Sequence, residues 1–171
     1  MLKIKPPDYK FCPFCGGKLQ VRLEEERKRK YCSACNWTYY PHVAGSAAAV
    51  IIRKGKVLMV KRKREPYKNT WTFPAGFVDF GEHPTETLAR EIAEETGLKI
   101  KKAELIKVLQ SVDDPRSPGH FLFFYRAQVS GNKLKTDKAE NTNVKWKDIK
   151  KTPKIGWKSN RYIFKLLKNR N

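Results

Sequence analysis

The chain has 171 residues, an apolar content of 40% and a formal net charge of +20 from 37 basic and 17 acidic residues. This length holds one ordinary domain and a small appendage, and the composition is that of a globular protein. No apolar run approaches membrane-spanning length, and residues 1–8 lack the apolar segment of a secretory signal, so we expect a cytoplasmic protein without a membrane partner.

The positive charge favours polyanionic partners, which include nucleotides and RNA. Most of the excess is lysine, and the lysines are scattered through the sequence rather than gathered in one block. A lysine-rich surface also arises from the overall composition or growth temperature of the source. RNA is therefore one candidate partner beside small nucleotides, and the charge alone does not select it.

Four cysteines near the N-terminus form two Cys-x-x-Cys pairs separated by 16 residues, namely Cys12, Cys15, Cys32 and Cys35. This spacing is typical of a zinc ribbon, in which two tight turns supply a tetrahedral Cys₄ site. Two disulfides or a redox dithiol are the alternatives. Disulfides are rare in the cytosol, however, and a redox motif needs only one pair. Because all four thiolates are used, we predict that the Zn²⁺ is structural rather than catalytic.

Residues 1–41 are predicted to form this ribbon, and residues 42–171 a second domain. Between the cysteine pairs, residues 18–23 and 29–31 are predicted to pair as a hairpin, with the charged run 24–30 at its tip. A module of about 40 residues buries little core, so we expect the metal to supply much of its stability.

The second domain is predicted to contain several strands and two helices. Strands are predicted at 47–53 and 56–63 around the turn Lys54-Gly55, then at 71–76, 103–112 and 120–129, with a short strand or turn at 145–149. Helices are predicted between Pro84 and Gly97 and at 160–168. Loops fill 64–70 and 113–119. One helix between strands and one at the end predict an α/β (α+β) fold.

The first helix has clear ends. Pro84 suits the first turn, where its missing N–H costs nothing, and Gly97 suits the position after the last turn, where φ is often positive. An apolar stripe is predicted to pack this helix on the core. Its members are Leu88, Ala89, Ile92, Ala93 and Thr96.

Glu91, Glu94 and Glu95 lie at positions i, i+3 and i+4 and so share one face of this helix. Three neighbouring carboxylates repel one another unless a cation lies between them. Mg²⁺ and Mn²⁺ prefer oxygen ligands of this kind, so the pattern predicts a divalent-metal site and phosphate chemistry. A solvated face with salt bridges is the alternative.

The same segment matches the Nudix box, which reads Gly-x₅-Glu-x₇-Arg-Glu-apolar-x-Glu-Glu-x-Gly-apolar. The matching residues are Gly76, Glu82, Arg90, Glu91, Ile92, Glu94, Glu95, Gly97 and Leu98. The chain therefore resembles a Nudix hydrolase over about residues 43–169. The resemblance implies an α/β/α sandwich with a mixed sheet, here preceded by the Cys₄ zinc ribbon. It also implies a Mg²⁺- or Mn²⁺-dependent enzyme that hydrolyses a pyrophosphate bond.

The resemblance assigns roles within the box. Glu91 and Glu95 would bind the metal directly, with help from the backbone carbonyl of Ala75 or Gly76. Glu94 would bind the metal or orient the attacking water. Two further catalytic positions, Glu82 and Arg90, would hold these groups in place.

Outside the box, family members often supply a further acid or base from a later loop. Glu140 is our candidate, and a solvated loop glutamate is an equally good interpretation; Asp113 and Asp114 are weaker candidates. Arg62 and Arg64 lie at a strand end before a loop, where they would contact substrate phosphate or simply remain solvated.

A zinc ribbon ahead of this domain resembles the NADH pyrophosphatase lineage. That lineage carries Ser-Gln-Pro-Trp-Pro-Phe-Pro-x-Ser after the box, and residues 109–120 of this chain lack that motif. ADP-ribose is therefore the leading predicted substrate, with FAD or NAD(H) next, and a nucleoside monophosphate is the product. An RNA 5′-end pyrophosphohydrolase and a non-catalytic nucleotide-sensing or nucleic-acid-binding module are the alternatives. The resemblance allows a homodimer but locates no interface.

Overall fold

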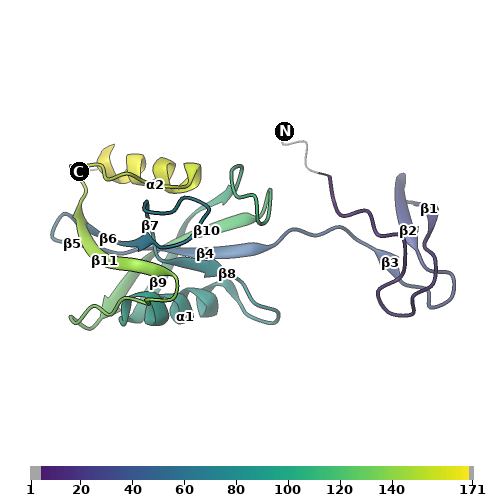
Figure 1. The fold of residues 1–171 in the computed structure, drawn as a ribbon, viewed down its shortest axis with the longest axis horizontal. Helices are drawn as coiled ribbons and strands as arrows, with labels where there is room; N and C mark the ends of the chain where they lie inside the picture. Colours follow the sequence, from purple (N-terminus) through teal and green to yellow (C-terminus); the bar gives the residue numbers. More distant parts are fainter. Residues whose placement is uncertain (1–4, 170–171) are drawn as a thin grey trace. The chain divides into compact units, whose positions relative to one another are not determined.

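The computed structural model describes residues 5–169. The chain forms two compact units, here called the ribbon unit, which ends at His42, and the main unit, which begins at Val43 (Figure 1). Each unit is described by itself. No described helix has both the length and the apolar character needed to cross a membrane.

The ribbon unit contains a three-stranded antiparallel sheet of β1 (Gln20–Glu24), β2 (Arg27–Tyr31) and β3 (Thr38–Tyr39). The predicted hairpin is present, but its turn is shorter than the predicted tip. Glu25 and Glu26 alone form the turn, with φ of 48° and 61°. A two-residue hairpin turn of this kind requires positive φ at both positions, which lets the basic residues that follow pair with β1.

The main unit holds two four-stranded sheets. In the first, β8 (Ala75–Phe77), β4 (Gly45–Val50), β10 (Phe121–Ser130) and β9 (Lys99–Gln110) lie in that order. The β4–β10 pair is parallel and the others are antiparallel, so this sheet is mixed. The second sheet is antiparallel and is built from β11 (Asn141–Asp148), β6 (Lys56–Arg62), β5 (Ile52–Arg53) and β7 (Trp71–Thr72).

The predicted strand 47–53 divides between the two sheets. β4 belongs to the first sheet and β5 to the second, and the chain passes from one to the other at Ile51. The predicted turn at Lys54-Gly55 is confirmed, because both residues have positive φ, 47° and 71°. The predicted short element at 145–149 is the second half of the longer strand β11.

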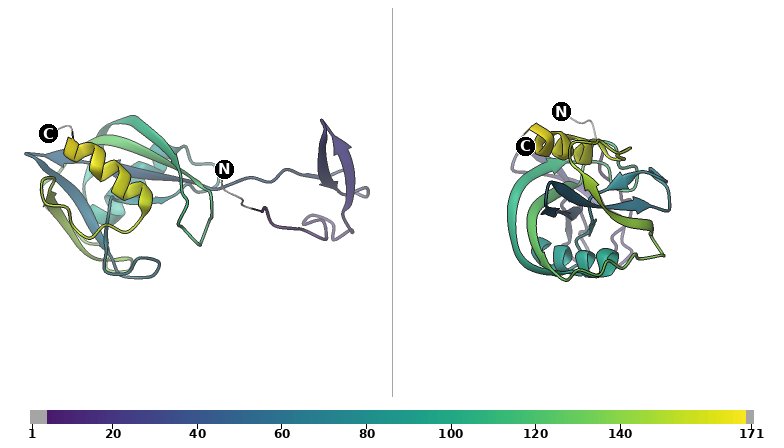
Figure 2. Two further views of the ribbon diagram at one scale, coloured as in Figure 1. Left: turned by 90° about the horizontal axis from the view of Figure 1, so that it is seen from above. Right: turned by 90° about the vertical axis from the view of Figure 1, so that its left-hand side faces the viewer.

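Two helices cover the strands from opposite sides, α1 (Pro84–Thr96) on one and α2 (Lys158–Asn169) on the other (Figures 1 and 2). Alternation along β4 and β6 supplies the two cores between these layers. The core under α1 contains Ala47, Ala49, Leu58, Val60, Leu88 and Ile92, and the core under α2 contains Ala48, Val50, Val57, Met59, Ile163 and Phe164. This arrangement confirms the predicted α/β/α sandwich with a mixed sheet.

Helix α1 begins and ends where the sequence predicts. His83 caps its N-terminus and forms a capping box with Glu86, Pro84 occupies the first turn, and Gly97 ends the helix with a φ of 72°. The predicted apolar stripe is wrong at one position, because Ala93 is exposed. Thr87 is buried instead, since the helix is rotated slightly toward its acidic side.

Candidate active site and metal centres

A cavity of about 310 Å³ lies between helix α1, the strand β8, the end of β6 and the loops that follow β9 and β10. This volume lies at the lower end of the range of small-molecule sites, which is about 300–1,000 Å³. Its wall is formed by Ser46, Arg62, Thr72, Ala75, Gly76, Phe77, Arg90, Glu91, Glu94, Glu95, Ser111, Asp114, Arg116, His120, Leu122, Asp137, Glu140, Trp157, Ser159 and Asn160. The predicted box glutamates of α1 therefore face a site of suitable size for a nucleotide.

Gly76 lets the first carboxylate reach the sheet. A Cβ atom at this position would lie 1.8 Å from Oε1 of Glu91 and 2.1 Å from its carboxyl carbon. No side chain fits in that space, so only glycine lets the β8 backbone approach the carboxylate. Burial raises the pKa of Glu91 above its ordinary value, although its hydrogen bond with Arg90 acts in the opposite direction.

Glu95 is the buried carboxyl group of the box, only 6% exposed. Its Oε2 accepts a hydrogen bond from the backbone N–H of Ala75 at 2.9 Å, and its Oε1 accepts one from Nδ2 of Asn141 at 2.7 Å. Burial raises its pKa to about 8. The carboxyl group is thus held by neutral donors, and a divalent cation would supply the charge that favours its ionised form.

Arg90 connects the loop before α1 to the helix. Its Nε and Nη2 donate to the two carboxylate oxygens of Glu82, both at 2.9 Å, and its Nη1 donates to Oε1 of Glu91 at 2.6 Å. The hydrogen bond from Arg90 lowers the pKa of Glu82 to about 2. Glu86, four residues before Arg90, is engaged in the helix cap and accepts a hydrogen bond from the backbone N–H of His83.

Glu94 points away from the buried part of the site. Its side chain is 57% exposed and lies 3.7 Å from Nη1 of Arg90. The three box glutamates line one cavity, but their oxygens are not gathered around a single point. Within residues 5–169, the four cysteines alone bring three or more potential ligand atoms within 4.8 Å of one another.

The predicted residues outside the box have different positions. Glu140 is exposed at the rim of the cavity, immediately before β11, and its charge acts on Glu91 and Glu95. Arg62 also lines the cavity. Arg64 does not belong to the wall: its side chain is exposed, and its carbonyl accepts a hydrogen bond from Arg62 at 3.5 Å.

Sequence reasoning missed the wall that the β9–β10 loop and the start of α2 supply. Arg116, His120, Trp157 and Asn160 all line the cavity. Asp114, a weak candidate for an acid or base, is buried and paired with Arg116 at 2.8 Å. Arg116 and Trp157 lie in segments without periodicity or a known motif, and His120 and Asn160 begin predicted elements whose patterns indicate packing, so only an arginine and histidine close together in a proline-containing loop could have drawn attention to this wall.

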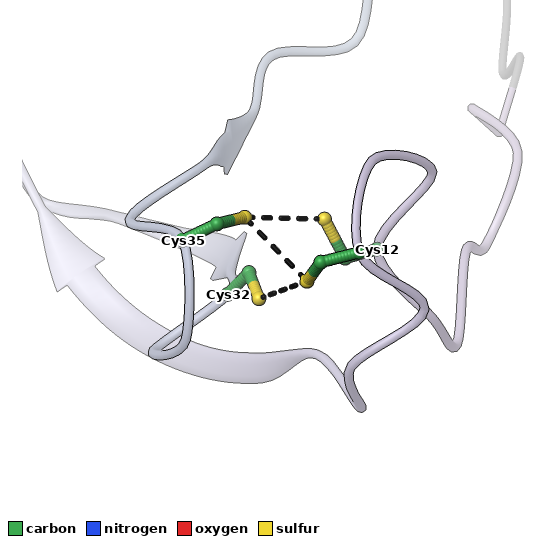
Figure 3. A group of neighbouring side chains, drawn as sticks. Cys12, Cys32 and Cys35 are labelled. Atoms are coloured by element: carbon green, nitrogen blue, oxygen red, sulfur yellow. Dashed lines mark hydrogen bonds between the residues drawn. The ribbon is translucent and has the colours of Figure 1, made fainter.

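The four cysteines form a second candidate metal centre in the ribbon unit. Sγ of Cys12 lies 3.5 Å from that of Cys35, and Sγ of Cys15 lies 3.4 Å from that of Cys32. The sulfur atoms of the three labelled residues point toward one another (Figure 3). Tetrahedral thiolates at about 2.3 Å from a zinc ion would lie about 3.8 Å apart, so the cluster needs little adjustment to hold one. Gly16 and Asn36, which follow the second cysteine of each pair, both have positive φ.

Comparison with known proteins agrees with both centres. The NUDIX domain family matches residues 43–167, and the Nudix N-terminal family matches residues 10–41. An ADP-ribose pyrophosphatase of Methanocaldococcus jannaschii is 35% identical over 151 residues, which cover 86% of this chain and 84% of that protein.

Two further similarities show the extent of the match. The NAD-capped RNA hydrolase NudC of Vibrio atlanticus is 27% identical over 85% of this chain, but the match spans only 52% of that protein. The crystal structure of a NUDIX hydrolase from Nitrosomonas europaea superposes with a TM-score of 0.75 at 24% identity, covering 95% of this chain and 92% of that one. The chain belongs to the Nudix hydrolase family, with a Nudix N-terminal zinc ribbon ahead of the catalytic fold.

Proposed function

We propose that this protein hydrolyses the pyrophosphate bond of a nucleoside diphosphate linked to another group, with ADP-ribose as the leading substrate. The observation that carries this proposal is the buried carboxyl group of Glu95 and the partly buried one of Glu91, which lies against the backbone of Gly76, in a cavity of nucleotide size. The product would be a nucleoside monophosphate.

Mg²⁺ or Mn²⁺ fits the chemistry of these donors. Glu91, Glu94 and Glu95 would hold it, with the carbonyl of Ala75 or Gly76, because hard cations prefer oxygen ligands. The raised pKa of Glu95 supports this assignment, since the group lacks a cationic partner in its buried position. When bound, such an ion neutralises diphosphate charge and lowers the pKa of bound water.

The other residues of the site would position the metal-binding carboxylates and the substrate or transfer protons. Arg90 and Glu82 fix the loop before α1 and restrain Glu91. Glu140 lies on the exposed rim, where its carboxylate would accept a proton from the attacking water or return one to the leaving phosphate. Arg62 would contact substrate phosphate from the cavity wall.

Similarity supports the choice of substrate. The Methanocaldococcus relative is an ADP-ribose pyrophosphatase and matches most of both chains. FAD and NAD(H) share the same diphosphate linkage and come next. None of the roles proposed above requires RNA, because each of them acts on the diphosphate or on the metal that would bind it.

Hydrolysis at an RNA 5′ end is the second candidate. It is favoured by the net charge of +20 and by similarity to NAD-capped RNA hydrolases, although this chain spans about half the length of those relatives. For the ribbon unit we propose a structural Zn²⁺ bound by Cys12, Cys15, Cys32 and Cys35, because four thiolates complete its coordination.

The test is product analysis on ADP-ribose, FAD, NADH, diadenosine polyphosphates, deoxynucleoside triphosphates and capped RNA, each with Mg²⁺ and then Mn²⁺. We expect rapid AMP release from ADP-ribose and a fall in kcat of about 100-fold or more in Glu95→Gln. Glu104→Gln, an exposed change on β9, is the matched control. Faster turnover of capped RNA would favour the second candidate, and full activity of Glu95→Gln would overturn the assigned site.

A further inference from the structure

Two arginines that line the cavity contact the same aromatic ring. The guanidinium carbons of Arg62 and Arg116 lie 5.3 Å and 5.4 Å from the ring centroid of Trp157. The ring of Tyr67 packs edge-on against that of Trp157, with 4.5 Å between the ring centroids, and Trp157 is only 8% exposed. Trp157 is therefore a support for two cations and offers little open surface on which a base could stack.

Arg116 is held in one orientation. Its Nε and Nη2 donate to the two oxygens of Asp114 at 3.0 Å and 2.8 Å, and the side chain of Asp114 is only 4% exposed. The guanidinium also lies 5.3 Å from the ring centroid of Phe77. A guanidinium has five N–H donors, and the Asp114 pair uses two of them. The edge formed by Nη1 and Nη2 keeps a fork of donors for a second anion.

Arg62 lies close to a second cation, Arg116, and forms no ion pair with an acidic side chain of residues 5–169. Its Nε donates to the carbonyl of Pro66 at 2.8 Å. Burial lowers its pKa, and the charge of Arg116 lowers it further. Asp114 balances one of the two positive charges on Trp157, so this part of the wall keeps an excess positive charge inside a partly buried site.

The geometry points to a phosphate clamp: Arg62 and Arg116, both supported by Trp157, bind the substrate diphosphate from the wall formed by the end of β6 and the loop after β9. This inference rests on the proposed function. It adds Arg116, which lies outside the Nudix box, as a substrate-binding residue. Asp114 fixes the direction of the Arg116 fork.

Phosphate is the anion that fits best, because planar guanidinium forks bind its oxygens in pairs. The box carboxylates Glu91 and Glu95 would repel the same anion unless metal covers them. The arginine wall therefore supplies attraction that is independent of the metal. This difference separates the clamp from the catalytic centre in an experiment.

The experiment measures ADP-ribose binding by calorimetry in buffer free of Mg²⁺ and Mn²⁺ and without chelator, so that the ribbon keeps its zinc while neither hydrolysis nor the catalytic metal contributes. We expect Arg116→Gln to weaken binding roughly 10- to 100-fold, as for loss of a charged hydrogen-bonded pair. Arg116→Lys keeps the charge but loses the fork, so its affinity should fall between the two. Arg64→Gln, an exposed change outside the cavity, is the matched control and should bind within about twofold of wild type.

Adenosine serves as the second probe because it lacks phosphate. Its affinity should be unchanged by Arg116→Gln, which also shows that the variant is folded. Equal ADP-ribose binding by wild type and Arg116→Gln would overturn the clamp, as would undetectable wild-type binding without Mg²⁺ and Mn²⁺. Arg116-dependent binding without any turnover in Mg²⁺ or Mn²⁺ would support the clamp and reject the proposed hydrolysis.

Discussion

The lack of a side chain at Gly76 determines how the candidate active site is packed. Glu91 reaches the β8 backbone only because residue 76 has no Cβ, and the close approach buries a carboxylate that Arg90 partly neutralises. The site thus brings an acidic helix face against a sheet edge without an intervening layer of side chains. In the proposed metal site, that closeness would let a backbone carbonyl of β8 and the carboxylate of Glu91 contribute to binding one ion.

Gly76→Ala should therefore damage the site more than the fold. The new Cβ would lie 1.8 Å from Oε1 of Glu91, so the carboxylate must move out of the cavity. We expect kcat for ADP-ribose to fall about 100-fold or more and the free energy of unfolding to fall by about 1–3 kcal/mol, as for overpacking. Turnover and urea unfolding measure the two effects.

The control is Gly45→Ala on the neighbouring strand β4. There a Cβ would meet its nearest atom, Cγ2 of Val78, at 3.4 Å, which is ordinary contact. Stability should change by about 0.5 kcal/mol or less, with activity retained. Wild-type turnover by Gly76→Ala would contradict the role assigned to this glycine.

At the scale of elements, the helix that carries the site could be predicted well from local signals. Pro84 and Gly97 define its ends because their backbone preferences are local properties. The rotation of the helix was less predictable: Ala93 is exposed, although it belongs to the apolar stripe. Which face packs is decided by the neighbouring sheets, and the burial of Glu95 is decided by donors from β8 and β11.

The opposite wall could not be predicted for a related reason. Arg62 ends strand β6, whereas Arg116 and Trp157 come from two loops, and the three residues meet only when the sheets form. No periodicity marks such loop residues, so their shared role is visible only in the folded chain. Arg62 was found from its place at a strand end, whereas Arg116 and Trp157 were not.

The loop before α1 is tied to the helix by the Arg90–Glu82 pair, and this link predicts a pH effect. The hydrogen bonds lower the pKa of Glu82 from 4.5 to about 2. A carboxyl group whose pKa is lowered by folding stabilises the fold above its unfolded pKa and loses that effect as pH falls. Stability should therefore decrease as the pH falls from about 4.5 to about 2, and Glu82→Gln should flatten this part of the curve.

Thermal unfolding midpoints measured across this pH range check the expectation. Glu104→Gln on the exposed strand β9 removes a carboxyl group that forms no ion pair within residues 5–169, and its curve should follow the wild type. Parallel curves for Glu82→Gln and wild type would show that the Arg90 pair does not stabilise the loop.

On the scale of the whole molecule, the two units depend on different sources of stability. The main unit has two apolar cores between its sheets and helices. In the described part of the ribbon unit, the buried apolar side chains are Cys12, Cys32 and Tyr39, whereas Phe14 and Leu23 are 78% and 73% exposed. Two of those three buried residues are cysteines of the candidate metal centre, so we expect the proposed zinc ion to replace the core that this short segment cannot build.

Removal of zinc should consequently unfold the ribbon unit alone. Amides held by the knuckle turns, such as those of Cys12, Gly16 and Cys32, should lose protection from hydrogen exchange when a strong chelator is added. Amides of β4 and β6 should keep theirs, because the main unit contains no cysteine. Native mass spectrometry should find one zinc per chain before treatment and none after.

Since the chelator also removes catalytic metal, turnover is compared after excess Mg²⁺ is restored, and it should return if the ribbon is purely structural. Lasting loss of turnover would instead show that the folded ribbon is needed for hydrolysis, and protected ribbon amides without zinc would show that the cysteines stabilise the unit without metal.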